Sequence, residues 1–576
     1  MISSSSSRKK KENKSVVGSF VCTGAGRVSS DDRASKRLGE LHRRRRPRLG
    51  YSAMQDPPPR GETPDSGPIA PMCNPKGSPS QQDDDSRGGE VMRSLDDLPE
   101  DICRRIHARM SLQNAARLAC ASHTFWRSWR CYPNLDLRQR ILGLNGDHIS
   151  KIDHILQNHS GVGMKKLRIE LFDCDKVDSC YINSWLRIAV TAGIEELTLY
   201  LPATAEDEAY YSFPCSLLFN GSENSIRYLD IGICAFRPTA GLGRWRSLAI
   251  LFLSNVLIAD DELEGLLYNC AALEHLGLLN CPEIVCLKIP CLLRRLRVLR
   301  VSICRNLQVI DSNAPNISSF QFSGSLVSIS FGSALQVKNV HMECLEFGQS
   351  NIVLHARTKL LSYAPNVETL VISSPNEMIS TPTLSRKFLH LEYLHISLIG
   401  NEAISPDYDY LSLVSFLEAS PRLETFILEV RQPSMEHESV IRNASQLRRL
   451  PQQRHTSLKS VTIVGFSSAK SLVELTCHIV ENATSLERLT LDTSHGCQSS
   501  GGCSVNIPQR RYYTESGALE AASPYMCIPM GEDIIMETVK ARLAIRVHVT
   551  GKVPSSVMLE VVEPCSWCFG VEDVDA

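Results

Sequence analysis

Residues 273–307 read LEHLGLLNCPEIVCLKIPCLLRRLRVLRVSICRNL and contain one pattern twice. Leu273, Leu276 and Leu278 are spaced as apolar-x-x-apolar-x-apolar, and a Cys stands three residues after the last of them. The second copy begins at Leu296. The end of each pattern alternates apolar and other residues, which is typical of a short strand with one buried face. We therefore expect a strand in each copy, followed at the Cys by a turn and a return segment of helix or loop.

The pattern recurs along most of the chain, with starts that are 21 to 35 residues apart. This period and this order of apolar residues fit the leucine-rich repeat. Because no single unit can bury its apolar side, the units are expected to stack into a solenoid with parallel strands on its concave face. The starts are Met164, Ile194, Ile226, Leu248, Leu273, Leu296, Ile317, Met342, Val367, Leu391, Leu423, Leu458 and Leu486.

The predicted fold class is α/β, with an irregular solenoid over residues 150–495. A different mixed fold with leucine-rich strands is the alternative, above all after Leu398, where the steps lengthen. Residues 496–576 are less regular and are expected to cap the open end, which terminal repeats need. Within them we expect a loop over Cys497–Cys503, a helix near Ile534–Leu543 and a strand over Ala544–Val549.

Side chains that flank the strand leucines are predicted to line the concave face. This surface is mixed and carries no strong charge, so it favours recognition of a protein over a phosphate backbone. The candidate target-binding residues, taken from the clearest repeats, are Tyr228, Asp230, His275, Arg300, Tyr393 and His395.

Upstream of the repeats, residues 94–137 read SLDDLPEDICRRIHARMSLQNAARLACASHTFWRSWRCYPNLDL and predict three short helices. Pro99 suits a first helical turn, and Ser111 and Ser122 suit the N-caps of the second and third helices. Ile102, Ile106 and Met110 predict an apolar stripe on the first helix. Three helices of this length form a very small core, so a partner is expected to cover part of the apolar surface.

The same stretch resembles the F-box, through Leu98-Pro99-Glu100-Asp101-Ile102, the run Leu118–His123 and a Ser-x-x-x-Trp ending. With Cys131-Tyr132-Pro133-Asn134-Leu135 and the repeats behind it, the chain is similar to plant F-box proteins with leucine-rich repeats. This resemblance implies docking on the Skp-type adaptor, and through it on the cullin, of an SCF ubiquitin ligase. The residues implied to face the adaptor are Leu98, Pro99, Ile102, Ile106, Leu118 and Trp126. The alternative is that these residues only hold the three helices together, and Ala121 stands where the family often has Val.

Residues 1–90 are predicted to form a disordered tail, basic at first and then rich in Pro and Asp. Residues 1–60 carry 15 Lys or Arg against 5 Asp or Glu, whereas the whole chain has a net charge of −1. Such a segment holds too little apolar surface to offset the entropy of ordering it. The run His42–Arg48 is a candidate nuclear import signal; a solvated tail and a transit peptide are the alternatives. We expect a nuclear or cytoplasmic protein, and no apolar run approaches the 18 residues of a membrane span.

The sequence lacks the common catalytic and phosphate-binding motifs: it has no Gly-rich phosphate loop, no Gly-x-Ser-x-Gly and no His-Glu-x-x-His. Cys565 and Cys568 form one Cys-x-x-Cys, but a structural zinc needs a second close pair. No metal or cofactor is therefore predicted.

The expected function is that of a non-catalytic substrate receptor that binds an unidentified target protein. The alternatives are a scaffold that does not lead to degradation and a sensor of a small molecule. The sensor would be favoured by a basic cluster under the solenoid, for which Arg294, Arg295, Arg297 and Arg300 are the candidates. A role in nucleic-acid binding is not expected.

Overall fold

The computed structural model describes residues 98–569. Not described within that range are residues 144–146, 173–176, 192, 203–209, 220–224, 239–244, 333–335, 345–350, 376, 384, 400–407, 432–436, 442–446, 495–529 and 566–567. The predicted tail over residues 1–90 and the predicted loop Cys497–Cys503 lie outside the described residues. Among the described residues, no helix is both long enough and apolar enough to cross a membrane.

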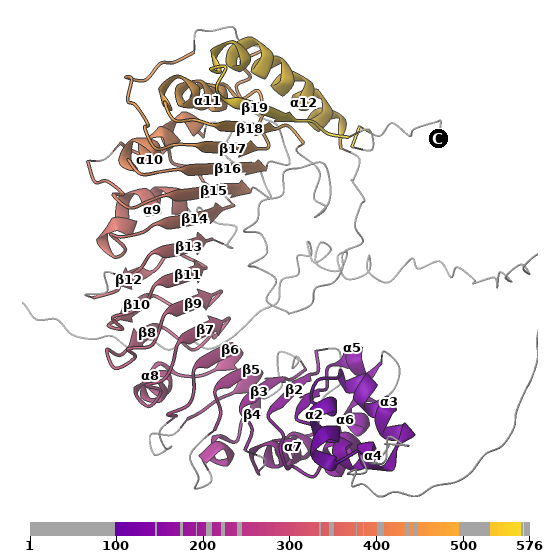
Figure 1. Ribbon diagram of the computed structural model, residues 1–576. Coiled ribbons are helices and arrows are strands. Elements are labelled where there is room, and N and C mark those ends of the chain that lie inside the picture. The colour runs from indigo at the N-terminus through magenta and orange to yellow at the C-terminus, as the bar shows by residue number, and fades with distance from the viewer. Residues whose placement is uncertain are drawn as a thin grey trace, which may run out of the picture. The chain divides into compact units, whose positions relative to one another are not determined.

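A 16-stranded sheet runs through the protein, and its strands follow one another nearly in chain order (Figure 1). All of its strand pairs are parallel, which confirms the predicted repeat architecture. The strands also stay in register beyond Leu398, so the alternative of a different fold there is wrong. The strands are β1 (Asn134–Asp136), β2 (Lys166–Glu170), β3 (Glu196–Tyr200), β4 (Tyr211–Ser212), β5 (Tyr228–Ala235), β6 (Ile250–Leu257), β7 (His275–Leu279), β9 (Val298–Ser302), β11 (Ser319–Ser323), β13 (Asn339–Glu343), β14 (Thr369–Ser374), β15 (Tyr393–Ile399), β16 (Thr425–Arg431), β17 (Ser460–Val464), β18 (Arg488–Asp492) and β19 (Met558–Val562).

The return segments contain helices where the repeats are long and short strands where they are compact. The helices are α6 (His148–Asn158), α7 (Ser179–Thr191), α8 (Asp260–Tyr268), α9 (Ile352–Lys359), α10 (Val414–Ala419), α11 (Lys470–Asn482) and α12 (Glu532–Ala544). Strands β8 (Cys286–Ile289), β10 (Val309–Ser312) and β12 (Ser328–Ser330) form a second parallel sheet that the sequence did not predict. Their pairing satisfies backbone groups in segments too short for a helix.

Alternate residues of each strand are buried between the sheet and the return segments. In β7, Leu276 and Leu278 are almost fully buried, as is Cys281 at the turn that follows. One predicted start was misplaced: β13 carries Val340 and Met342 in the core, so its pattern begins at Val337 rather than at Met342. Met342 satisfied the spacing by coincidence, because it is the last apolar residue of one pattern and resembles the first of another.

The C-terminal region differs from its predicted structure. The strand expected over Ala544–Val549 is wrong, because α12 continues into a wider helical turn over Ile545–Val549. Ala541, Ala544, Ile545 and Val549 are buried, and their spacing is helical although the segment also alternates. The sheet instead ends at β19, which pairs with β18.

Three helices precede the sheet at the predicted places: α2 (Glu100–His107), α3 (Leu112–Ala121) and α4 (His123–Trp129). The Ser111 hydroxyl accepts a hydrogen bond from the backbone N–H of Asn114, and Ser122 accepts one from Phe125. Both predicted N-caps are therefore present. Helix α4 packs against both α2 and α3.

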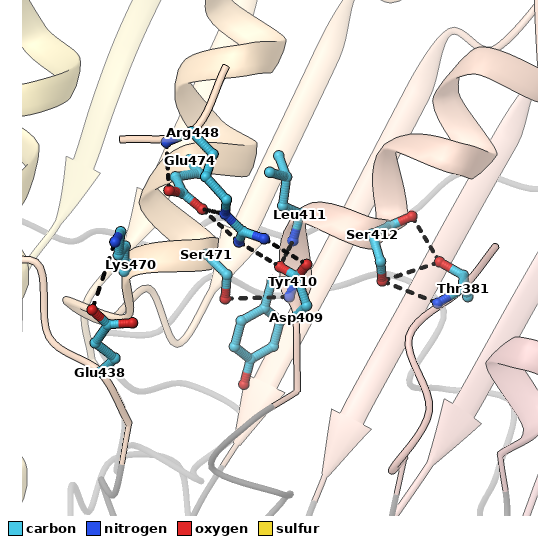
Figure 2. Close-up of polar contacts among 10 residues, drawn as sticks. All are labelled: Thr381, Asp409, Tyr410, Leu411, Ser412, Glu438, Arg448, Lys470, Ser471 and Glu474. Atoms are coloured by element: carbon cyan, nitrogen blue, oxygen red, sulfur yellow. Dashed lines mark hydrogen bonds and ion pairs between the residues drawn. The ribbon is translucent and has the colours of Figure 1, made fainter. Parts of the chain in front are cut away.

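A polar cluster joins three return segments near the C-terminal end of the sheet (Figure 2). The guanidinium of Arg448 donates to both carboxylate oxygens of Asp409, at 2.8 and 2.9 Å. Its Nε and its backbone N–H each donate to Glu474 of α11, at 2.7 Å. Ser471 accepts a hydrogen bond from the backbone of Tyr410 at 3.3 Å. These contacts fasten the return segments of three consecutive repeats, which start at Leu391, Leu423 and Leu458.

Neighbouring strands share a position with left-handed backbone. The φ angles are 59° at Ile233, 53° at Asn255, 47° at Asn280 and 55° at Ile303. Each of these residues comes directly after a residue that pairs with its counterpart on the neighbouring strand, in β5, β6, β7 and β9. Asn tolerates this conformation, and the Asn280 amide donates to the Asn255 side chain at 2.5 Å. A β-branched side chain is strained there.

Replacing Ile303 by Asn is expected to raise the free energy of unfolding by about 1 kcal/mol, because Asn adopts the left-handed conformation more readily than a β-branched residue, for which such strain is of order ~1–3 kcal/mol. Chemical denaturation measures the change. Ile233→Asn is the control, since Ile233 packs against the core and loses that contact, which offsets the gain. A lower stability for Ile303→Asn than for the wild type would contradict this explanation.

Candidate functional site

The three N-terminal helices form their own small core without most of the residues predicted to face an adaptor. Cys103, His107 and Phe125 are buried, and the rings of His107 and Phe125 lie 4.9 Å apart. Of the predicted stripe, Ile102 and Ile106 are only partly buried, whereas Met110 lies beyond the end of α2 and packs against the main core. Burial lowers the pKa of His107, so the ring remains neutral near pH 7 and behaves as a core residue.

The residues predicted to face an adaptor stay accessible. Trp126 is 52% exposed, and the guanidinium of Arg130 lies 5.8 Å from the centre of its ring. Pro99 is exposed, while Leu98, Ile102, Ile106 and Leu118 are only partly buried. A large exposed aromatic residue beside other apolar groups is typical of an interaction site.

A second candidate site is a hollow of about 310 Å³ on the outward face of the sheet. The outward face is the side of the sheet formed by the side chains that alternate with the buried leucines of each strand. The hollow spans β2 to β9 and is lined by Arg168, Glu170, Phe172, Tyr200, Tyr228, Asp230, Phe252, Leu253, Ser254, Asn255, Gly277, Leu278, Leu279 and Arg300. Its volume falls at the lower end of the range for pockets that hold small ligands.

A carboxylate held by two tyrosines lies within this hollow. The Tyr200 hydroxyl donates to Asp230 Oδ1 at 2.8 Å, and the Tyr228 hydroxyl donates to Oδ2 at 3.1 Å. Tyr200 is also 3.1 Å from the Ser254 hydroxyl. Burial raises the pKa of Asp230, although the two tyrosine hydrogen bonds act in the opposite direction. Burial together with the Asp230 charge raises the pKa of both tyrosines, so they remain hydrogen-bond donors at neutral pH.

Two glycines let aromatic rings pack closely over the sheet. A Cβ at Gly232 would lie 2.5 Å from the Tyr200 ring, and a Cβ at Gly277 would lie 2.2 Å from the Phe252 ring. Both distances are shorter than any real contact, so each ring lies directly over its glycine. The two rings therefore form part of the floor of the hollow.

Arginines stand at the two ends of the hollow. On β2, Arg168 Nε donates to Glu170 at 2.6 Å, and the pair is also joined through the terminal nitrogen at 2.5 Å. On β9, Arg300 Nε donates to Gln321 at 2.7 Å. The rim is thus polar, while the floor is aromatic with one carboxylate.

The structure brings together three of the six predicted target-binding residues. Tyr228, Asp230 and Arg300 line the hollow. His275 occupies the first register position of β7, beside Ile250 and Val298, and does not line it. Tyr393 and His395 lie on β15, four strands beyond β9 in the sheet.

His395 belongs to a separate polar group on the outward face. Its Nε2 is 3.7 Å from Glu429, which also accepts from Arg431 at 2.8 Å and from Ser397 at 3.1 Å. Burial, with the nearby charges of His395 and Arg300, lowers the pKa of His341 to about 3. This group and the hollow are two distinct features of one face.

The sequence missed Arg168, Tyr200 and Phe252 as parts of the hollow. Arg168 and Phe252 occupy the same register position as Asp230, and Tyr200 occupies that of Gly232. The predicted set used only the clearest repeats, so applying the same rule to β2, β3 and β6 would have found them. Phe172 follows the end of β2, and no pattern in the sequence marked it.

Two other features of the sequence are the candidate basic cluster and the Cys-x-x-Cys pair. Arg294 and Arg295 lie in the turn before β9, whereas Arg300 lies within the strand, so the predicted basic cluster is divided. The Sγ atoms of Cys565 and Cys568 are 3.6 Å apart. Among the described residues, no group of three or more His, Cys, Asp or Glu side chains is placed to hold a metal ion.

Comparison with known proteins gives a consistent family. A family model described as "At1g61320/AtMIF1, LRR domain" matches residues 155–566. The FBD-associated F-box protein At1g66310 of Arabidopsis thaliana is 21% identical over 454 residues, which cover 72% of this chain and 93% of that protein. The F-box/LRR-repeat protein At5g02910 of the same plant is 26% identical over 325 residues, which cover 53% of this chain and 67% of that protein. The A. thaliana F-box/LRR-repeat protein At3g03360 is 29% identical over 238 residues, covering 37% and 46%. Since the family model matches most of the chain, the protein belongs to the At1g61320/AtMIF1 family of leucine-rich-repeat domains and is a plant F-box/LRR protein.

Proposed function

We propose that this protein is the substrate-recognition subunit of an SCF-type ubiquitin ligase. Helices α2, α3 and α4 dock on the Skp-type adaptor, and the outward face of the sheet binds a target protein. The observation that carries the proposal is the exposed Trp126, on helices that also carry accessible apolar residues and whose own core is already formed. The F-box names of the relatives support it.

The proposed contribution to catalysis is proximity. The adaptor and the cullin link this chain to the ubiquitin-carrying enzyme, which supplies the reacting groups. By holding the target on the same assembly, the chain turns a bimolecular encounter into an intramolecular one, which raises the effective concentration of target lysines. No residue of this chain is required to touch the reacting atoms.

Affinity purification from plant cells tests the proposal with the double variant Leu98→Ala, Pro99→Ala. Adaptor and cullin are expected to disappear from the purified material, while the target is retained and enriched because it is no longer ubiquitylated. A scaffold role would instead show adaptor binding without ubiquitylation of any bound protein in a reconstituted complex. Retention of the adaptor by the double variant would overturn the docking surface.

Arg104→Ala is a matched control on the same helix. Arg104 is two residues from both Ile102 and Ile106, which is about 200° around a helix at 100° per residue. Its side chain therefore lies on the opposite face of α2. Its ion pair with Glu100 is exposed, so its loss costs at most about 1 kcal/mol. This variant is expected to co-purify with adaptor and cullin as the wild type does.

A further inference from the structure

We propose that the hollow between β2 and β9 binds an arginine side chain of the target protein. This inference rests on the proposed function, because it takes the outward face as the surface that meets the target. It goes further by naming the chemical group that the surface selects.

The floor of the hollow presents aromatic rings. Tyr200 and Phe252 both line it, and each ring is packed against a glycine on the side of the sheet. Tyr228 and Phe172 add two more rings, with Tyr228 at 6.2 Å from Phe252 and Phe172 at 5.2 Å from Tyr200. The face of an aromatic ring is negative and attracts a cation, most often a guanidinium.

A carboxylate stands in the same hollow. Each oxygen of Asp230 accepts one tyrosine hydroxyl, at 2.8 and 3.1 Å, and a carboxylate oxygen can accept a second donor. The tyrosines hold the carboxylate in a fixed orientation. Two parallel N–H groups of a guanidinium match this geometry, and such charge-assisted pairs are stronger than neutral ones.

Arg168 lies two strands from Asp230 in the same register row, and its charge acts on the Asp230 carboxylate. Arg168 is bound to Glu170 on its own strand, at 2.5 and 2.6 Å. Arg300 lies three strands from Asp230, which corresponds to about 14 Å at the usual strand spacing. Its Nε donates to Gln321, so part of its hydrogen-bonding capacity is used outside the hollow. The region around Asp230 and the rings therefore favours a cation from outside.

Arginine fits these features better than lysine does. Its guanidinium is planar, stacks on aromatic faces and binds a carboxylate through two hydrogen bonds, whereas an ammonium is a compact and strongly hydrated point charge. A volume of about 310 Å³ accommodates the guanidinium with its aliphatic stem.

Ligand-observed NMR on the full chain tests the inference with N-acetyl-L-arginine methylamide as the probe. The matched probes are the citrulline analogue, which has nearly the same shape without the charge, and the lysine analogue. The arginine probe is expected to bind at least about ten-fold more tightly than the citrulline probe, because a charged donor forms a stronger hydrogen bond to a carboxylate than a neutral donor does. It is also expected to bind more tightly than the lysine probe.

Two variants locate the site. Asp230→Asn, which keeps the shape, is expected to weaken binding of the arginine probe about ten-fold. Glu560→Gln is the control, because Glu560 occupies the same register row at the far β19 end of the sheet. Equal binding of the arginine and citrulline probes, or binding unchanged by Asp230→Asn, would overturn the inference. Adaptor binding measured on the same preparations keeps this outcome separate from a failure of the proposed function.

Discussion

Acidification from pH 5.5 to pH 2 is expected to destabilise the C-terminal end of the protein by about 3 kcal/mol through one residue, Glu537. Burial of Glu537 on α12 raises its pKa, but hydrogen bonds from His437 and Ser468 outweigh burial, and the pKa falls to about 2. His437 Nε2 lies 3.1 Å from the carboxylate, and the Ser468 N–H donates at 2.6 Å. Lys540 lies 3.5 Å away.

The sign follows from this depressed pKa. In the unfolded chain the Glu537 carboxyl has its ordinary pKa of 4.5, so the folded state binds the proton less tightly. The stabilisation is complete above about pH 5 and is lost as the pH falls through 4.5 toward 2. A difference of about 2.5 pKa units corresponds to roughly 3 kcal/mol.

Hydrogen exchange of the α12 amides measured against pH tests this prediction. Glu537→Gln is expected to weaken protection at neutral pH and to flatten its dependence on pH below 5. The exposed Glu532 begins the same helix, so Glu532→Gln serves as the control and should keep the wild-type profile. A wild-type protection profile that stays constant down to pH 2 would show that the Glu537 contacts do not stabilise the folded state.

Loss of the Arg448 side chain is expected to lower the free energy of unfolding by about 2 kcal/mol in Arg448→Met. Glu474 has a side chain that is 0% exposed, and it would be left with the backbone N–H of residue 448 as its remaining partner in the cluster of Figure 2. Breaking a fully buried ion pair costs ~3–5 kcal/mol. The expected value is smaller because the Arg448 side chain is 50% exposed, and water can partly replace it.

A double-mutant cycle isolates this interaction. Adding Glu474→Gln to Arg448→Met is expected to recover part of the loss, because the buried charge is removed. Lys459→Met is the control: its ion pair with Glu424 joins side chains that are 47% and 50% exposed, so its loss should change the free energy of unfolding far less than Arg448→Met does. Equal losses in Arg448→Met and Lys459→Met would mean that the cluster does not fasten the long repeats.

The repeat pattern predicted most of the fold, because the spacing of leucines reports directly which strand positions are buried. It failed where the same residues fit both the period of a helix and the period of a strand. Residues 544–549 alternate like a strand, yet Ala541, Ala544 and Val549 are buried in a helical conformation, and Ile545–Val549 packs against α11. It also failed at Met342, where neighbouring apolar residues allowed two registers.

The candidate sites were predictable only in part. The order of residues over 94–137 indicated the helices and their caps, but not that Cys103 and His107 would form the core of α2. On the outward face, the register rule indicated Asp230 and Arg300. It could not show that Tyr200 reaches across a strand to Asp230, because such contacts depend on side-chain directions that Gly232 makes possible.

The central claim is that α2, α3 and α4 present a surface made for a second polypeptide. Isothermal titration of the purified full chain with a Skp-type adaptor tests it most directly. The prediction is a 1:1 complex with a Kd of about 1 μM or tighter, weakened at least about 30-fold by Trp126→Ala, as for a buried aromatic anchor. Absence of binding at tens of micromolar adaptor, or a Kd that Trp126→Ala leaves unchanged, would contradict the claim.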